Sequence, residues 1–206
     1  MEIMKIFNPK ICQDALMVMA EPPGTRHRSS LIVGPYEETD AEYLPYNPEL
    51  SRAAMALAET IVAAKHDLQV EHIGSTAIAG CWGKGIIDLL VLYQPGDLES
   101  ARAALDRLKF QRQSGPEPFP ESRPMRVGSV EYLGRMYRVH AHVVESGIDE
   151  ARDLIRFRDI LRVNISLRRA YETEKRAILA RGITKSTEYS KAKGAFVRSV
   201  LAASVF

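Results

Sequence analysis

The chain has 206 residues, of which 46% are hydrophobic and 26% are charged, and its formal net charge is +2. This composition is typical of a soluble globular protein, and no apolar run approaches the ~20 residues that a membrane-spanning helix needs. Cys12 and Cys81 are too few for a disulfide framework, and the first residues lack a secretion signal, so we expect a cytoplasmic protein with free thiols.

Positive charge is concentrated toward the end of the chain. Residues 151–200 contain 13 Lys and Arg against 5 Asp and Glu, a net charge of +8, so the remainder carries −6. A basic helical region beside a neutral or acidic sheet favours an anionic ligand in the cleft between them. The alternative is that these basic side chains form solvated outer faces of the helices.

The first part of the chain leads to a predicted helix. Residues 1–30 are interpreted as an N-terminal extension that packs on the domain or on a second subunit of a homodimer. A short strand is expected at 31–33. Residues 48–65 have apolar side chains at helical spacing, and Asn47 before Pro48 suits the N-cap position.

A glycine-rich turn between two strands is the first candidate for a binding site. Residues 68–73 alternate apolar and polar side chains, which predicts a strand, and the apolar run 86–91 predicts a second one. Glycines let backbone N–H groups approach a phosphate, and a short helix beginning at Ser75 would direct its positive end toward that anion. Gly74 and Ser75 are therefore a candidate phosphate cradle. The alternative is an ordinary strand-to-helix turn.

Asp88 is the one charged residue within the second apolar run. An unpaired carboxylate among apolar neighbours is costly, so we expect a bound cation or a basic partner. Mg²⁺ binds through one or two carboxylates together with phosphate oxygens, which suits this position. Lys84 could instead pair with Asp88, contact a phosphate, or remain a solvated loop residue.

The remaining elements complete an α+β pattern. Residues 97–110 are amphipathic and predict a helix, and the proline-rich stretch 111–124 predicts a surface loop that could cover the site. Two paired strands and then three helices are expected, at 125–133, 135–144, 151–164, 166–181 and 186–205.

Four segments in order resemble the GrpB family, a branch of the nucleotidyltransferase-fold superfamily. They are EHIGSTAIAG with Lys84 and IIDLLV, the strand 137–144 with its His-x-His pair, the helix 154–162, and the segment 189–196. The resemblance covers about residues 31–203. It implies a single domain at 31–206, with a nucleotidyltransferase-like mixed β-sheet, helices packed mainly on one side, and a C-terminal helical region.

The resemblance also implies roles for particular residues. The superfamily signature is Gly-Ser, a spacer of roughly a dozen residues and then an acid, and here Gly74-Ser75 precedes Asp88 by that spacing. Catalytic members carry a second carboxylate two residues further on. That position is Leu90 in this chain, so the paired-carboxylate geometry for two-metal phosphoryl transfer is incomplete.

His140 and His142 resemble a replacement of the superfamily's third acid by imidazole. Because they are two residues apart on one predicted strand, they point to the same face. With Asp88, and with Glu71 on the neighbouring strand, they would suit Zn²⁺, Mn²⁺ or Fe²⁺ better than Mg²⁺. The pair could also act as a general base, or be hydrogen-bonded at the edge of the core.

These patterns lead to one main hypothesis. The chain is interpreted as a nucleotide- and metal-binding nucleotidyltransferase-like protein, with Asp88 and His142 as catalytic candidates and with Arg156 and Lys193 contacting phosphates. The expected partner is a nucleotide or another phosphorylated small molecule, whereas nucleic acid is not indicated. The alternatives are a metal-dependent hydrolase and a non-catalytic ligand-binding or folding-accessory module, similar to a domain fused to some dephospho-CoA kinases.

Overall fold

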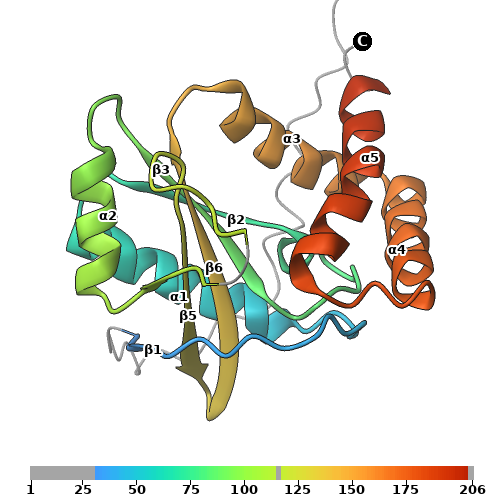
Figure 1. Cartoon of the computed structure of the whole chain (residues 1–206), viewed down its shortest axis with the longest axis horizontal. Helices are drawn as coiled ribbons and strands as arrows, with labels where there is room; N and C mark the ends of the chain where they lie inside the picture. The colour runs from blue at the N-terminus through green and yellow to red at the C-terminus, as the bar shows by residue number, and fades with distance from the viewer. Residues whose placement is uncertain (1–30, 115–116, 204–206) are drawn as a thin grey trace, which may run out of the picture.

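One mixed β-sheet organises the part of the chain that the computed structural model describes, residues 31–114 and 117–203 (Figure 1). Its strands follow the order β1-β5-β6-β3-β2, and β4 pairs with β5 beside β1. The strands are β1 (Val33–Gly34), β2 (Gln69–Ile73), β3 (Ile87–Tyr93), β4 (Gln111–Arg112), β5 (Met125–Tyr132) and β6 (Arg135–Glu145).

The pairing of β3 with β6 is parallel, and the other pairings in the described sheet are antiparallel. In this register Asp88 lies beside His140, and Leu90 lies beside His142. Because side chains alternate between the faces of a strand, Asp88 and both histidines lie on the same face of the sheet. The predicted common face of the two histidines is confirmed.

The helices follow the predicted order. Asn47 caps α1 by accepting a hydrogen bond from the backbone N–H of Glu49 at 2.9 Å, as expected from its position before Pro48. The helical elements are α1 (Pro48–Ala64), the single 3₁₀ turn η2 (Ser75–Ala77), α2 (Leu98–Arg107), α3 (Asp149–Val163), α4 (Ile165–Ala180) and α5 (Ser186–Ala203).

The main core lies between one face of the sheet and the helices α1 and α2. Leu57, Ile61 and Leu105 are fully buried there against Leu89 and Val91 of β3. Apolar side chains spaced three and four residues apart give each helix the face that this core needs. The predicted α+β class is confirmed.

The opposite face of the sheet is only partly covered by apolar packing. Leu90 and Leu92 of β3 form a smaller cluster with Ala151 of α3, so α3 covers one end of this face. The other end carries Asp88 and the histidines, and it remains polar. This division leaves room for a site beside α3.

The C-terminal helices attach through the glycine turn rather than through the sheet itself. Tyr171 of α4 stacks on Phe196 of α5, with ring centroids 5.5 Å apart, and meets Phe157 of α3 edge-on at 5.2 Å. Ile78 and Cys81, from the turn, are buried in the same cluster. The predicted C-terminal helical region is therefore present and is held by its own core.

One predicted segment differs in the structure, and another lies outside the described residues. Residues 111–124 were predicted to be a loop throughout, but Gln111 and Arg112 form the short strand β4, whose two side chains are exposed. The predicted extension at 1–30 lies outside the described residues. None of the described helices combines the length and the apolar character that a membrane crossing requires.

Candidate functional site

A cavity of about 1270 Å³ lies against the polar part of the sheet. Its walls come from β2, β3, β5 and β6, from the helices α3 and α5, and from the segment before β5. Of the residues proposed from sequence, those that line it are Gly74, Lys84, Asp88, His140, His142 and Lys193.

Gly74 holds Asp88 at the wall of this cavity. It ends β2 with φ 72° and ψ −174°, a backbone conformation that is essentially restricted to glycine. A Cβ atom placed on Gly74 would lie 2.3 Å from Oδ2 of Asp88, so the carboxylate packs directly on the glycine backbone. The Gly-Ser…Asp spacing therefore reflects a contact between its first and last members.

Asp88 is the centre of a polar cluster. Its Oδ1 lies 3.4 Å from Nδ1 of His140 and 3.9 Å from Nε2 of His142. On its other side, His140 uses Nε2 to share a 2.8 Å hydrogen bond with the hydroxyl of Tyr36. A chain of contacts thus runs from Tyr36 through His140 to Asp88.

The protonation states in this cluster follow from burial and charge. Burial alone would raise the pKa of Asp88, but His140 and His142 stabilise the anion and hold that pKa well below its usual range. Burial lowers the pKa of His142, although Asp88 partly offsets this. At neutral pH the cluster therefore combines an ionised Asp88 with a neutral His142.

Two lysines of the cavity wall lie against the same aromatic ring. The Nζ atoms of Lys84 and Lys193 lie 5.3 and 5.7 Å from the centroid of the same ring, that of the buried Tyr189. Burial, and then the charge of Lys193, lower the pKa of Lys84 to about 8. Tyr171, and to a smaller extent Asp88, raise the pKa of Lys193, although burial opposes them.

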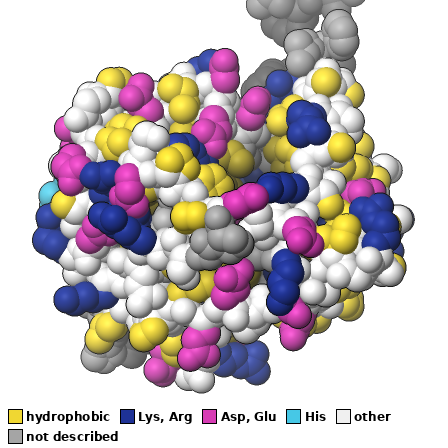
Figure 2. All heavy atoms as spheres, in the orientation of Figure 1, with side chains coloured by type: hydrophobic (Ala, Val, Ile, Leu, Met, Phe, Trp, Pro, Cys, Tyr) yellow, Lys and Arg dark blue, Asp and Glu magenta, His cyan; other side chains and the backbone are white. Residues whose placement is uncertain are grey.

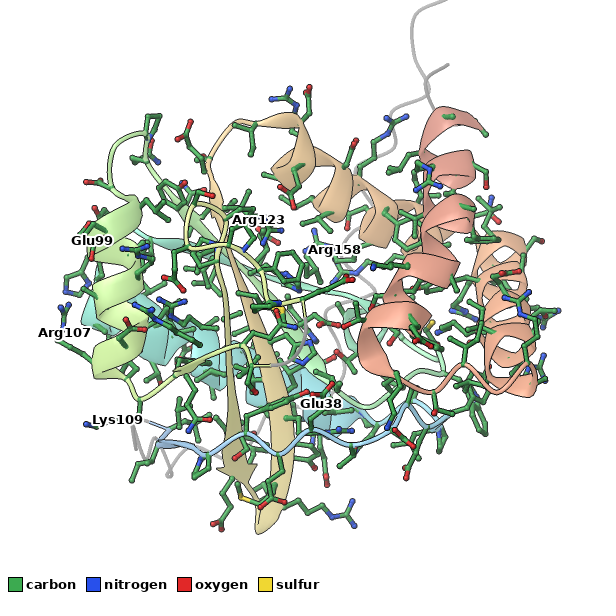
Figure 3. All side chains as sticks on the ribbon, viewed as in Figure 1. Glu38, Glu99, Arg107, Lys109, Arg123 and Arg158 are labelled. Atoms are coloured by element: carbon green, nitrogen blue, oxygen red, sulfur yellow. The ribbon has the colours of Figure 1, made fainter. Side chains whose placement is uncertain are left out.

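Three residues proposed from sequence do not line the cavity. Ser75 turns its hydroxyl toward Gly83, where a Cβ atom would meet it at 2.1 Å. Glu71 pairs with Arg158, which reaches from α3 toward the sheet, at 2.6 Å (Figure 3). Arg156 lies on the other side of α3, in a separate surface hollow. The structure therefore does not bring these three residues together with Asp88.

The predicted metal ligands were Glu71, Asp88, His140 and His142. Within the part of the chain that the structure describes, no three histidine, cysteine or carboxylate side chains are arranged to hold a metal ion. Glu71 is engaged by Arg158, and His140 is engaged by Tyr36. The predicted four-ligand set is therefore not assembled, and the residues as they stand do not fit a metal site.

Tyr36 and Phe119 are among the residues of the cavity wall that sequence reasoning did not single out. Tyr36 stands 104 positions before its partner His140, so no local pattern could link them. Phe119 belongs to the proline-rich stretch that was expected to cover the site, and its ring meets His142 edge-on with centroids 5.9 Å apart. The proline content of that stretch was the available signal.

Charge is mixed on the visible surface. Figure 2 shows basic and acidic side chains interspersed across the face that it presents. For example, Lys191 of α5 and Glu117 pair at 2.5 Å, and both line the cavity. The excess of basic residues at 151–200 therefore does not form a surface of one sign on this face.

Comparisons with known proteins point to one family. The family model described as GrpB protein matches residues 41–203. A UPF0157 protein from Streptomyces coelicolor is 31% identical over 134 residues, which are 65% of this chain and 67% of that protein. The crystal structure of the conserved protein GrpB from Enterococcus faecalis matches with a TM-score of 0.60 at 21% identity, covering 79% of this chain and 96% of the other.

A weaker match is the Cid1 poly(U) polymerase. It has a TM-score of 0.47 at 12% identity, and the match covers 63% of this chain and 42% of that one. No function follows from a similarity of this size.

Proposed function

Because the chain belongs to the GrpB family, and because two lysines and an ionised carboxylate line its cavity, we propose that it binds a nucleotide or another phosphorylated small molecule. In this proposal the phosphates lie near Lys84 and Lys193, and the remainder of the ligand lies along the wall that contains Phe119 and Phe157.

The observation that carries this proposal is the pair of partly buried lysines, Lys84 and Lys193, in the wall of one cavity. Ammonium groups that are removed from water and brought toward one another are unfavourable, and a phosphate between them would offset that cost. The charge of Asp88 favours the protonated form of both lysines, and this carboxylate is already stabilised by two imidazoles. A phosphate placed near both lysines would therefore be stabilised by two ammonium groups.

The cavity also has room for a second molecule. Typical pockets for one small ligand occupy roughly 300–1000 Å³, whereas this cavity is about 1270 Å³. The reaction we propose is transfer of a nucleotidyl group to an acceptor hydroxyl, in which an oxygen–phosphorus bond forms and pyrophosphate leaves. The neutral His142 would take the proton of the hydroxyl, since Asp88 has too low a pKa to be an effective base.

Leu90 favours a second candidate, ligand binding without transfer. It stands where a second carboxylate would be expected, and it is fully buried in the apolar cluster beneath α3. An acid at this position would have to replace that packing. A metal-assisted transfer with two carboxylates is therefore not supported by the residues present, and binding is proposed independently of turnover.

The test is the thermal stability of the metal-stripped full chain with each nucleoside triphosphate, alone and with Mg²⁺, Mn²⁺ or Zn²⁺. A ligand at ~100 times its dissociation constant adds about 2.7 kcal/mol to the free energy of unfolding, which raises the melting temperature by several degrees. We expect one nucleotide to give a saturable shift, with release of pyrophosphate when the acceptor is present.

A matched pair of variants locates the binding. Lys193→Met should remove most of the shift, whereas Lys185→Met should keep it, because Lys185 is exposed outside the cavity and pairs with Asp40. Absence of any shift at millimolar nucleotide would overturn the proposal. A shift with metal alone that is lost in Asp88→Asn would instead favour the metal-dependent hydrolase, and binding without release of pyrophosphate would favour the non-catalytic module.

A further inference from the structure

Lys84 and Lys193 come from distant parts of the chain and meet inside one cavity. Lys84 precedes β3, and Lys193 lies on α5, yet both line the cavity and both approach the ring of Tyr189. Tyr189 is only 1% exposed, and both lysine side chains are partly buried. Buried cations close together favour the loss of a proton from one of them.

Burial and the surrounding charges shift the pKa values of the two lysines in opposite directions. Lys193 keeps its proton, because Tyr171 and Asp88 stabilise the charged form. The charged groups that face Lys84 are Lys193 from α5 and Arg138 from β6, which favour its neutral form, and Asp88 from β3 and Glu38 from the segment before α1, which favour its charged form. Burial is the largest effect and lowers the pKa of Lys84 to about 8, so about half of this lysine is the neutral amine at pH 8.

We propose that Lys84 is a nucleophilic amine that forms an imine with a small aldehyde or ketone that also carries an anionic group, and that Lys193 binds the anion. This is an activity beyond nucleotide binding. It uses the same cavity, but it does not require that a nucleotide binds there.

The chemistry needs only the amine and the carbonyl compound. The nitrogen lone pair of Lys84 attacks the carbonyl carbon, and the electrons of the carbon–oxygen double bond move to oxygen, which takes up a proton from the nitrogen. Loss of the hydroxyl with the remaining nitrogen proton releases one water and leaves the carbon–nitrogen double bond. A lysine placed in an apolar pocket beside another cation is a known way to activate an amine for this step.

The walls of the cavity suit such a product. Leu154 and Phe157 of α3 and Val197 of α5 form an apolar side of the same cavity. Apolar walls restrict the access of water, and water is the reactant that reverses imine formation. The partly buried Lys84 therefore combines a reactive amine with surroundings that preserve the adduct.

The test uses pyridoxal 5′-phosphate as the probe, because it carries an aldehyde and a phosphate. The full chain is incubated with the probe at pH 8, the imine is reduced with borohydride, and the labelled lysines are identified by mass spectrometry of peptides. Lys185 is the internal reference, since it is 75% exposed, lies outside the cavity and pairs with Asp40. A neutral fraction of about one half at pH 8 predicts labelling of Lys84 at least about tenfold faster than the reference.

Two comparisons sharpen the result. Pyridoxal, which lacks the phosphate, should label Lys84 much more slowly than the phosphorylated probe, while the reference should react with both probes equally. Lys84→Arg keeps the positive charge but has no nucleophilic amine, so this variant should lose the fast label. If Lys84 is labelled no faster than the exposed Lys185 in the same wild-type chain, the imine proposal is overturned. This comparison does not depend on whether the Lys84→Arg variant folds.

Discussion

At the scale of single residues, the contact between Gly74 and Asp88 explains why the turn before η2 must begin with glycine. Gly74 combines a positive φ with a position where any Cβ atom would collide with the carboxylate of Asp88. The carboxylate of Asp88 therefore occupies the space that a side chain at position 74 would need. A change at either position should affect both the turn and the cluster around the histidines.

We predict that Gly74→Ala lowers the free energy of unfolding by about 2–4 kcal/mol, measured by urea denaturation. Part of this cost is the positive φ, at roughly 1–2 kcal/mol, and the rest is the displacement of Asp88 from the added methyl group. Gly134→Ala is the matched control. Gly134 has φ 75° in the β5–β6 turn, and a Cβ atom there meets nothing within 4 Å, so only the first part of the cost should appear. Equal losses in the two variants would contradict this account.

At the scale of elements, Arg126 joins the segment before β5 to α2. Its side chain is 1% exposed, and it pairs with Asp106 of α2 at 2.7 Å and with both oxygens of Glu121 at 3.0 Å. Glu121 also pairs with Arg102 of α2 at 3.1 Å. These contacts hold the end of the segment that carries Phe119 to the cavity wall.

We predict an asymmetry when this network is broken. Glu121→Ala with Asp106→Ala leaves a buried guanidinium without its acids and should cost about 3–5 kcal/mol. Arg126→Met should cost less, because both acids are partly exposed, at 35% and 46%, and can be hydrated. Urea denaturation measures both costs, and faster amide hydrogen exchange at residues 118–124 should accompany either change. A larger loss in Arg126→Met would contradict the expectation.

The elements also show how far sequence reasoning reached. Alternating and helical spacings predicted the long strands and the five long helices of the described residues, because each buries a face that its own residues define. The strand β4 was missed, since two exposed residues at an edge have no pattern of their own. Arg156 was placed at the site by analogy, but its helix turns it toward Arg152 and Ile160, on the side away from the cavity.

The candidate site was predictable only where its members are local in sequence. Gly74, Lys84 and Asp88 fall within one stretch, and the two histidines fall within one strand, so their spacing carried the signal. The pairing of Glu71 with Arg158 and the contact of Tyr36 with His140 depend on how distant segments pack. Such contacts are set by tertiary structure, and a single sequence does not display them.

At the scale of the whole molecule, the stability of the chain should depend on pH through His72. The hydroxyl of Thr76 donates to the carbonyl of Ile86, so it must accept from Nε2–H of His72, at 2.9 Å. Burial lowers the pKa of His72 from 6.5 to about 4. The unfolded chain therefore binds a proton below pH 6.5 that the folded chain takes up only near pH 4.

We predict that the contribution of His72 is fully present above pH 6.5 and is lost as the pH falls toward 4, because protons bind more readily to the unfolded state in that range. The shift corresponds to about 3 kcal/mol as an upper bound. His72→Gln keeps a side-chain donor but does not titrate, so its urea unfolding curves should depend less on pH between 6.5 and 4. Parallel pH profiles for the variant and the wild type would refute this assignment.

The parallel pairing of β3 with β6 also has a consequence during synthesis of the chain. During synthesis Asp88 leaves the ribosome first, His140 follows about 50 residues later, and Lys193 comes last. A nascent chain therefore contains the acid before it contains the histidines and the helix α5. Pairings between distant segments form slowly, because a long loop must close first. A growing chain therefore has no complete pocket, and any ligand that fills the cavity can act only on the finished protein.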